Sequence, residues 1–158
     1  MKALIVYDSV FGNTEKIALA MREALASSAE VNAFRVGDVK SEQLQELDIL
    51  IVGSPTRAFS PTPDITKWLK GLPAKSLSGM KVAAFDTRVD VKQTGSKVLS
   101  GMVKILGYAA EPIGKRLVKK GGQLGIDSEG FIVLGTEGPL KDGEKERAVE
   151  WIKALINQ

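Results

Sequence analysis

Residues 8–14, Asp-Ser-Val-Phe-Gly-Asn-Thr, carry the side chains best suited to binding a phosphate. They lie between residues 3–7, an apolar run that predicts a strand buried on both faces, and residues 15–26, whose apolar spacing predicts a helix. Free backbone N–H groups and the positive end of a helix dipole attract anions at such a turn. No lysine follows the glycine as in the Gly-Lys-Ser/Thr nucleotide loop. The turn therefore suits a phosphate held by hydroxyls and amides without a metal, and an ordinary capped turn is the alternative.

The chain contains neither cysteine nor histidine among its 158 residues. Without cysteine there are no disulfides, thiolate metal sites or iron–sulfur clusters. Without histidine there are no Ser-His-Asp triads, imidazole metal sites or histidine-ligated haem. We therefore assign no catalytic side chain and no metal site, and any redox or group-transfer chemistry requires an organic cofactor.

Length and composition fit a single domain over residues 1–158, and no apolar run is long enough to span a bilayer. Without a signal-peptide pattern, we expect a cytoplasmic protein that does not insert into membranes. The net charge is +3. The densest basic cluster, Lys115, Arg116, Lys119 and Lys120, could meet an acidic partner or nucleic acid, although a solvated loop or strand end is the usual explanation.

The rest of the chain alternates predicted strands and helices. Strands are expected over 31–36, 48–53 and 81–85, and helices over 39–46, from about 64, over 96–106 and over 144–156. Residues 109–117 and 131–134 look extended around a Gly-rich segment, which suggests a last strand interrupted by an insertion. This alternation predicts an α/β fold with a five-stranded parallel sheet and helices on both faces. The doubly wound arrangement that we adopt as the expected fold has the strand order 2-1-3-4-5.

Three unusual loops each follow a predicted strand: the first loop (residues 8–14), the second loop (54–63) and the third loop (86–95). In a doubly wound parallel sheet the carboxyl ends of all strands lie on one edge, so these loops should converge at the switch point of the strand order. A mononucleotide fits this arrangement, with its phosphate on the first loop and its flat group between the other two.

Residues 7–18 of this sequence resemble the FMN phosphate loop of the flavodoxin superfamily, and the likeness in fold and loop placement extends over essentially the whole chain. Ser9, Gly12 and Thr14 match the family pattern, whereas Phe11 replaces a second hydroxyl. An aromatic residue there is similar to the flavodoxin domains of flavodiiron proteins and to flavodoxin-like quinone reductases. Residues 53–57, Gly-Ser-Pro-Thr-Arg, resemble the second FMN loop of those reductases.

The resemblance implies that FMN contacts all three loops. The first loop would hold the phosphate, the second the ribityl chain and ring, and the third would line the site. The implied residues are Ser9, Val10, Phe11, Gly12, Asn13, Thr14, Pro55, Thr56, Arg57, Ala58, Phe59, Asp86, Thr87, Arg88 and Val89.

The two ring-binding loops contain one aromatic residue, Phe59, which is the candidate stacking partner or else a loop anchor packed on the next helix. Typical flavodoxins stack a tyrosine from the third loop, and this loop has no aromatic residue. Arg57 or Arg88 could favour the reduced, negatively charged flavin and raise its potential. The alternative is surface pairing of Arg57 with Asp64, and of Arg88 with a neighbouring aspartate.

The resulting hypothesis is an FMN-binding electron carrier rather than an enzyme with its own substrate. Because the chain is basic, its redox partner protein should offer an acidic docking surface, and no nucleic acid is expected. Two alternatives stay open: a flavin-dependent NAD(P)H:quinone-type oxidoreductase, and a flavin-free interaction or regulatory domain of the same fold. Residues 136–144 receive no functional assignment from the sequence.

Overall fold

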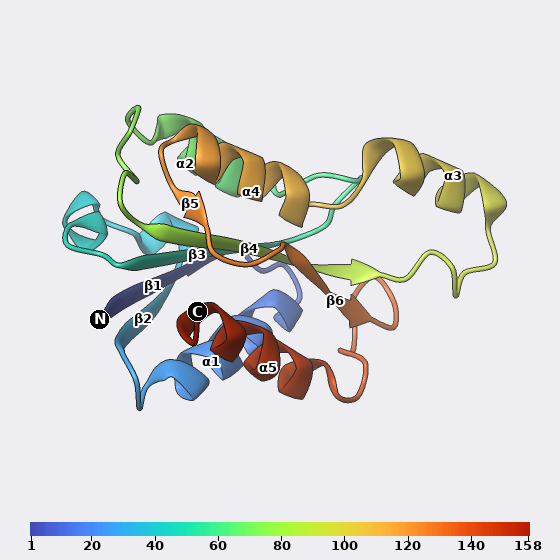
Figure 1. The fold of residues 1–158 in the computed structure, drawn as a ribbon. Coiled ribbons are helices and arrows are strands. Elements are labelled where there is room, and N and C mark those ends of the chain that lie inside the picture. Colours follow the sequence, from blue (N-terminus) through green and yellow to red (C-terminus); the bar gives the residue numbers. More distant parts are fainter.

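The computed structural model describes residues 1–158 and contains a central sheet between two layers of helices (Figure 1). The strands are β1 (Lys2–Tyr7), β2 (Glu30–Arg35), β3 (Ile49–Pro55), β4 (Lys81–Val89), β5 (Gln123–Leu124) and β6 (Glu129–Val133). The helices are α1 (Asn13–Leu25), α2 (Pro63–Gly71), α3 (Lys97–Leu106), α4 (Ala110–Lys119) and α5 (Glu144–Ile156), with short 3-10 turns at Val36–Asp38 and Ser41–Leu44.

The sheet is parallel, with the order β2-β1-β3-β4-β5. Two short strands share the fifth position, because β5 pairs with the start of β4 and β6 pairs with its end, from Phe85 to Val89. This confirms the predicted doubly wound α/β sheet and its order 2-1-3-4-5. The fifth position is divided as expected, but its first piece is β5 rather than residues 109–117, and only the second piece, at 131–134, overlaps the predicted one.

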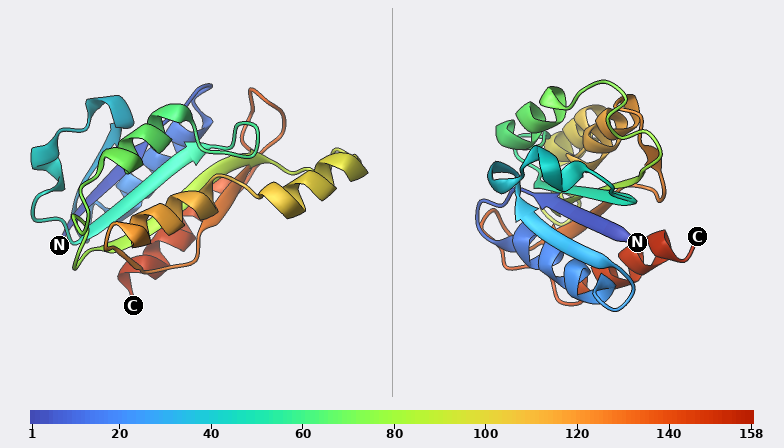
Figure 2. Two further views of the ribbon diagram at one scale, coloured as in Figure 1. Left: turned by 90° about the horizontal axis from the view of Figure 1, so that it is seen from above. Right: turned by 90° about the vertical axis from the view of Figure 1, so that its left-hand side faces the viewer.

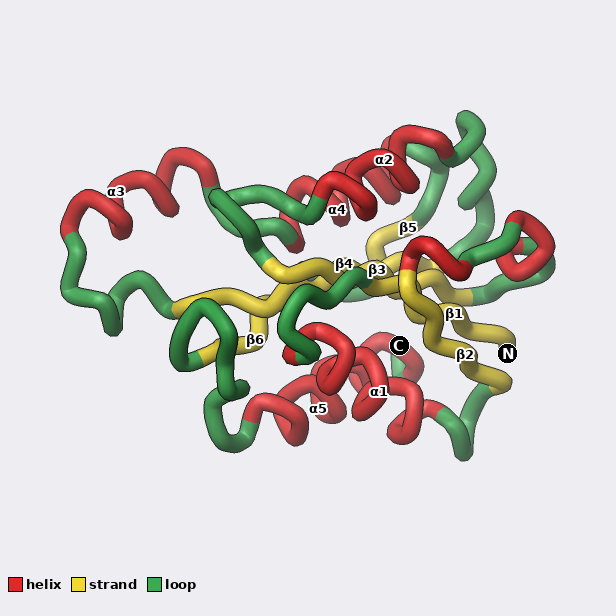
Figure 3. Tube along the Cα trace, turned by 180° about the vertical axis from the view of Figure 1, so that it is seen from behind, coloured by secondary structure: helices red, strands yellow, loops and turns green.

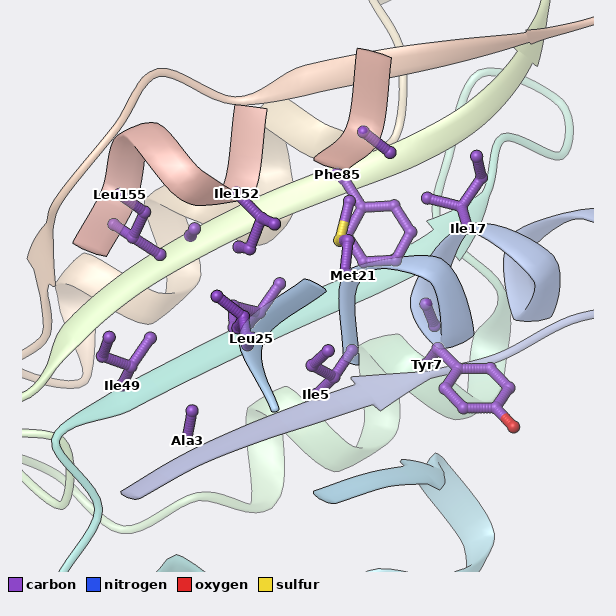
Figure 4. Close-up of a cluster of buried hydrophobic side chains, with 14 of the residues drawn as sticks. Ala3, Ile5, Tyr7, Ile17, Met21, Leu25, Ile49, Phe85, Ile152 and Leu155 are labelled. Atoms are coloured by element: carbon purple, nitrogen blue, oxygen red, sulfur yellow. The ribbon is translucent and has the colours of Figure 1, made fainter. Parts of the chain in front are cut away.

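Helices α1 and α5 cover one face of the sheet, and α2 and α4 cover the other (Figures 1 and 2). The strand period of two divides β1 between the layers: Ala3, Ile5 and Tyr7 pack on the first face, and Leu4 and Val6 on the second. Figure 4 shows the first of these clusters, closed by side chains of α1 and α5. Burying each such aliphatic side chain contributes about 1.5–3 kcal/mol.

Three local predictions differ from the structure. Residues 110–119 form helix α4 instead of an extended segment, and they bury Ala110, Ile113, Gly114 and Leu117 at helical spacing. The predicted helix over 39–46 is replaced by 3-10 turns. Residues 86–89, predicted as loop, extend β4 because β3 and β6 hydrogen-bond to them on either side.

Helix α3 forms where the sequence predicts it, and the hydroxyl of Ser96 accepts the N–H of Leu99 at 3.2 Å at its start. None of its side chains is buried, and the helix projects beyond the end of the sheet (Figures 1 and 3). No helix of the protein combines the length and the apolarity that crossing a membrane requires.

Candidate functional site

The three predicted loops meet at the carboxyl edge of the sheet. The hydroxyls of Thr14 and Thr87 share a hydrogen bond of 2.8 Å, which joins the first loop to the third. The backbone N–H of Thr56 donates to the carbonyl of Thr87 at 2.9 Å, which joins the second loop to the third. The convergence expected from the parallel topology is therefore present in the structure.

A cavity of about 400 Å³ lies between the loops, within the size range of small-molecule sites. It is lined by the predicted site residues except Gly12, Phe59 and Asp86, and in addition by Leu99, Val133 and Thr136. The lining consists of Ser9, Val10, Phe11, Asn13, Thr14, Pro55, Thr56, Arg57, Ala58, Thr87, Arg88, Val89, Leu99, Val133 and Thr136.

The first loop presents hydrogen-bond donors that the protein itself does not use. Gly12 adopts a left-handed conformation (φ 90°) as the N-cap of α1, which glycine tolerates without a steric penalty. The hydroxyl of Ser9 accepts the N–H groups of Gly12 at 3.1 Å and Glu15 at 3.4 Å. No acceptor within the protein binds four other backbone N–H groups, those of Val10, Phe11, Asn13 and Thr14. These free donors at a helix N-terminus form an anion site.

A charged network fixes the start of α1 beside this loop. The hydroxyl of Tyr7 donates to Glu15 at 2.8 Å, and Arg35 pairs with the same carboxylate at 3.0 Å. Arg35 also donates to the carbonyl of Ser9 at 2.9 Å. Burial, reinforced by the hydrogen bond to Glu15, raises the pKa of Tyr7 to about 12. The network leaves the donors of the loop free while holding its backbone in place.

The second loop turns sharply between Arg57 and Ser60, which form an isolated antiparallel bridge. Ala58 and Phe59 both have positive φ values, 46° and 64°, a conformation that non-glycine residues adopt at a cost. Arg57 forms no salt bridge, and its Cζ lies 5.7 Å from the centroid of the Phe11 ring. The aromatic side chain that lines the cavity is thus Phe11, whereas Phe59 lies outside its lining.

The end of β4, where the sequence predicts the start of the third loop, contains an ion pair between a buried aspartate and a largely buried arginine. Asp86 is fully buried, and Arg88 binds its carboxylate through Nε at 2.7 Å and Nη2 at 2.6 Å. The N–H of Ala110 at the start of α4 donates to the same carboxylate at 2.9 Å. Burial raises the pKa of Asp86, and Arg88 opposes this shift. Arg88 therefore pairs with a neighbouring aspartate, as one alternative predicted, but with the buried carboxylate of Asp86 rather than at the surface. The surface pair predicted between Arg57 and Asp64 is absent.

Tyr108 supplies an aromatic ring that the sequence of the third loop lacks. The Cζ of Arg88 lies 3.7 Å from the centroid of the Tyr108 ring, a cation–π contact. Sequence reasoning missed this contact because Tyr108 follows α3, and only the return of the chain to the sheet edge brings it to Arg88.

Residues 136–140, left without an assignment by the sequence, support the first loop. The side-chain amide of Asn13 donates to the carbonyl of Glu137 at 3.1 Å. A Cβ at Gly138, which has φ +110°, would lie 2.8 Å from Nδ2 of Asn13. Thr136 in the same turn lines the cavity. In the sequence, a role for this turn at the site was indicated only by its position after the last predicted strand, which places it at the same edge of the sheet.

The fold and site define a doubly wound α/β protein with a cavity at the switch point of its sheet, next to a loop with unbonded backbone N–H groups. A family model described as a flavodoxin domain matches residues 4–109. The chain therefore belongs to the flavodoxin family. The resemblance found in the sequence is confirmed at the level of the superfamily.

Individual relatives agree with this assignment. A flavodoxin from Clostridium saccharobutylicum is 33% identical over 89 residues, covering 55% of this chain and 56% of that protein. The match thus spans little more than half of the curated relative. A flavodoxin from the domain Archaea superposes with a TM-score of 0.78 at 22% identity, covering 99% of this chain and 98% of that one. Flavodoxin 2 from Bacillus cereus superposes with a TM-score of 0.74 at 25% identity, with 99% of both chains covered.

Proposed function

We propose that this protein binds FMN at the carboxyl edge of the sheet and carries electrons between partner proteins in the cytoplasm. The observation that supports FMN is the set of four unbonded backbone N–H groups in the first loop. They surround two nearly buried hydroxyls, those of Ser9 (7% exposed) and Thr14 (1% exposed). A dianionic phosphate is the ligand that such a set of donors fits.

The side chains of the first loop complement these amides. Ser9 already accepts two N–H groups, so its own O–H remains available to donate to an anion. The hydroxyl of Thr14 is hydrogen-bonded to the hydroxyl of Thr87, so these two hydroxyls lie next to each other. FMN, when bound, supplies reversible electron transfer, while these residues hold its phosphate and orient it.

The rest of the cavity suits a flat, partly apolar group. Pro55, Val89, Leu99 and Val133 supply aliphatic walls, and Phe11 supplies an aromatic one. The stacking role predicted for Phe59 would require its side chain to reach the flavin ring, although Phe59 does not line the cavity. Phe11 is the aromatic residue already in place.

Arg57 is the arginine best placed to stabilise negative charge on the reduced cofactor. Its guanidinium has no carboxylate partner and lies at the cavity, whereas the charge of Arg88 is neutralised by Asp86. A free cation at this position favours an anion more than a paired one does. We therefore assign the predicted raising of the redox potential to Arg57.

The proposed partner is a redox protein with an acidic docking surface, because this chain carries a net charge of +3. Charge of opposite sign steers the encounter and sets its dependence on salt. Association with such a partner should therefore slow as the ionic strength rises.

Titration of the apoprotein with FMN and with riboflavin tests the proposal. The fluorescence of each flavin should be quenched when it binds to the apoprotein. FMN should bind far more tightly than riboflavin, because only FMN carries the phosphate. Equal affinity for the two flavins, or no binding of either, contradicts the assigned site. NAD(P)H added to the FMN complex then distinguishes the functions: a carrier stays oxidised without a separate reductase, and direct bleaching indicates an oxidoreductase.

A further inference from the structure

Helix α3 carries a wide apolar face of which a large part is exposed to solvent. At about 100° per residue, its six aliphatic side chains occupy an arc of about 160°. The exposed fractions of five of them are 73% for Val98, 38% for Leu99, 39% for Met102, 84% for Ile105 and 55% for Leu106. Val98 and Ile105 are the most exposed of the five. Large aliphatic side chains concentrated in this way mark an interaction surface.

Both charged residues of α3 itself are lysines, and the nearest acidic residues along the chain, Asp90 and Glu111, lie before and after the helix. Lys97 and Lys104 lie on the opposite side of the helix, and Lys92 precedes it. From Val91 to Ala110 the chain contains no acidic residue. A surface in contact with the apolar arc would lie within about 10 Å of these lysines, about one Debye length at moderate salt. The segment therefore favours a partner surface that has an apolar layer in contact with the arc and anionic groups close to the lysines.

The position of α3 makes its apolar face accessible to a large flat surface. The helix projects past the end of the sheet, on the side that α2 and α4 cover (Figures 1 and 2). Its apolar arc is convex and purely aliphatic. Protein hot spots are enriched in Trp, Tyr and Arg held in pockets, and this face offers none of them. A lipid acyl layer requires only aliphatic area and nearby positive charge.

We propose that α3 is an amphipathic anchor that places the protein reversibly on an anionic lipid surface. Val98, Met102 and Ile105 would enter the acyl boundary, and the lysines would be attracted by the headgroups. A single short helix gives weak attachment that salt can reverse. The proposal concerns a surface outside the lining of the cavity, apart from Leu99, and it does not rest on FMN binding.

Co-sedimentation of the full chain, as purified, with vesicles tests this proposal. The protein should pellet with vesicles that contain phosphatidylserine and not with phosphatidylcholine alone. In about 1 M salt, where the Debye length falls to about 3 Å, pelleting should be lost. The double variant Val98→Ser and Ile105→Ser should partition at least about tenfold less, because two aliphatic side chains are removed from the contact.

Val118→Ser provides the matched control, since Val118 is an exposed aliphatic residue (48%) on the neighbouring helix α4. It should partition like the parent protein. Lys97→Gln with Lys104→Gln is a second test that keeps the apolar face, and it should remove the preference for phosphatidylserine.

Three results would overturn the proposal. The first is absence of pelleting with anionic vesicles. The second is equal pelleting of the parent and the double serine variant. The third is sedimentation velocity showing a dimer that the double variant dissociates, with no vesicle binding, which would mean that a second copy of the chain covers this face.

Discussion

Replacing Ser9 by alanine is the sharpest mutational test of the phosphate site. The hydroxyl accepts the N–H groups of Gly12 and Glu15 at 3.1 and 3.4 Å, and it is left as a donor to the ligand. Ser9→Ala removes both roles. Losing the two neutral hydrogen bonds at the start of α1 should lower the free energy of unfolding by about 1 kcal/mol.

The effect on FMN should be larger than the effect on stability. A hydrogen bond to a charged group contributes about 1.5–3 kcal/mol, which corresponds to a dissociation constant for FMN roughly tenfold to a hundredfold higher. Riboflavin, without the phosphate, should bind as before. Fluorescence titration of both flavins measures this, with Ser28→Ala, an exposed serine beyond the other end of α1, as the control. An equal loss for both flavins, or no loss for either, would refute the assigned role of Ser9.

Three further predictions follow from the geometry. Gly138→Ala should destabilise the protein and weaken FMN binding, because its Cβ would lie 2.8 Å from the amide of Asn13 at φ +110°; Gly37→Ala, with open space around it, should do neither in thermal unfolding and titration. Tyr7 should ionise near pH 12 in an absorbance titration. Because the pKa of Tyr7 is raised in the folded state, its contribution to the free energy of unfolding should be lost between about pH 10 and 12. Tyr7→Phe should remove this dependence of the free energy of unfolding on pH from denaturation curves. Arg57→Gln should lower the two-electron potential of the bound flavin by about 20 mV, the equivalent of about 1 kcal/mol for one partly solvated cation, and an unchanged potential would contradict its role.

The strands and helices with strong periodicity could be predicted from the sequence. Strands β1, β3 and β4 are apolar runs buried on both faces, and α1 and α5 show apolar residues at helical spacing. Alternation of the two kinds of element indicated a parallel sheet with helices on both faces, because parallel strands require crossover connections. It does not fix the order of the strands.

Helix α4 was mispredicted because Pro112 and Gly114 interrupt its helical pattern. In the structure Pro112 lies in the first turn, where no helical N–H bond is lost, and Gly114 packs against the sheet. The buried carboxylate of Asp86 receives the N–H of Ala110 at the start of this helix. Such a contact between distant residues leaves no local mark in the sequence.

The site was predictable where a loop follows a strand and unpredictable where distant segments return to it. The first loop could be identified from its hydroxyls, glycine and amide. Leu99, Tyr108 and Thr136 reach the site or its neighbours only through the path of the chain after β4 and β6. Their positions depend on tertiary contacts, which local patterns do not encode.

Backbone amide NMR spectra recorded during FMN addition test the central claim most directly. The claim is that the unbonded N–H groups of the first loop bind the phosphate. With FMN, the amide protons of Val10, Phe11, Asn13 and Thr14 should move downfield as they gain charged hydrogen bonds, and riboflavin should leave them nearly unmoved. Downfield shifts of equal size with riboflavin, or largest shifts outside the first loop, would contradict the account.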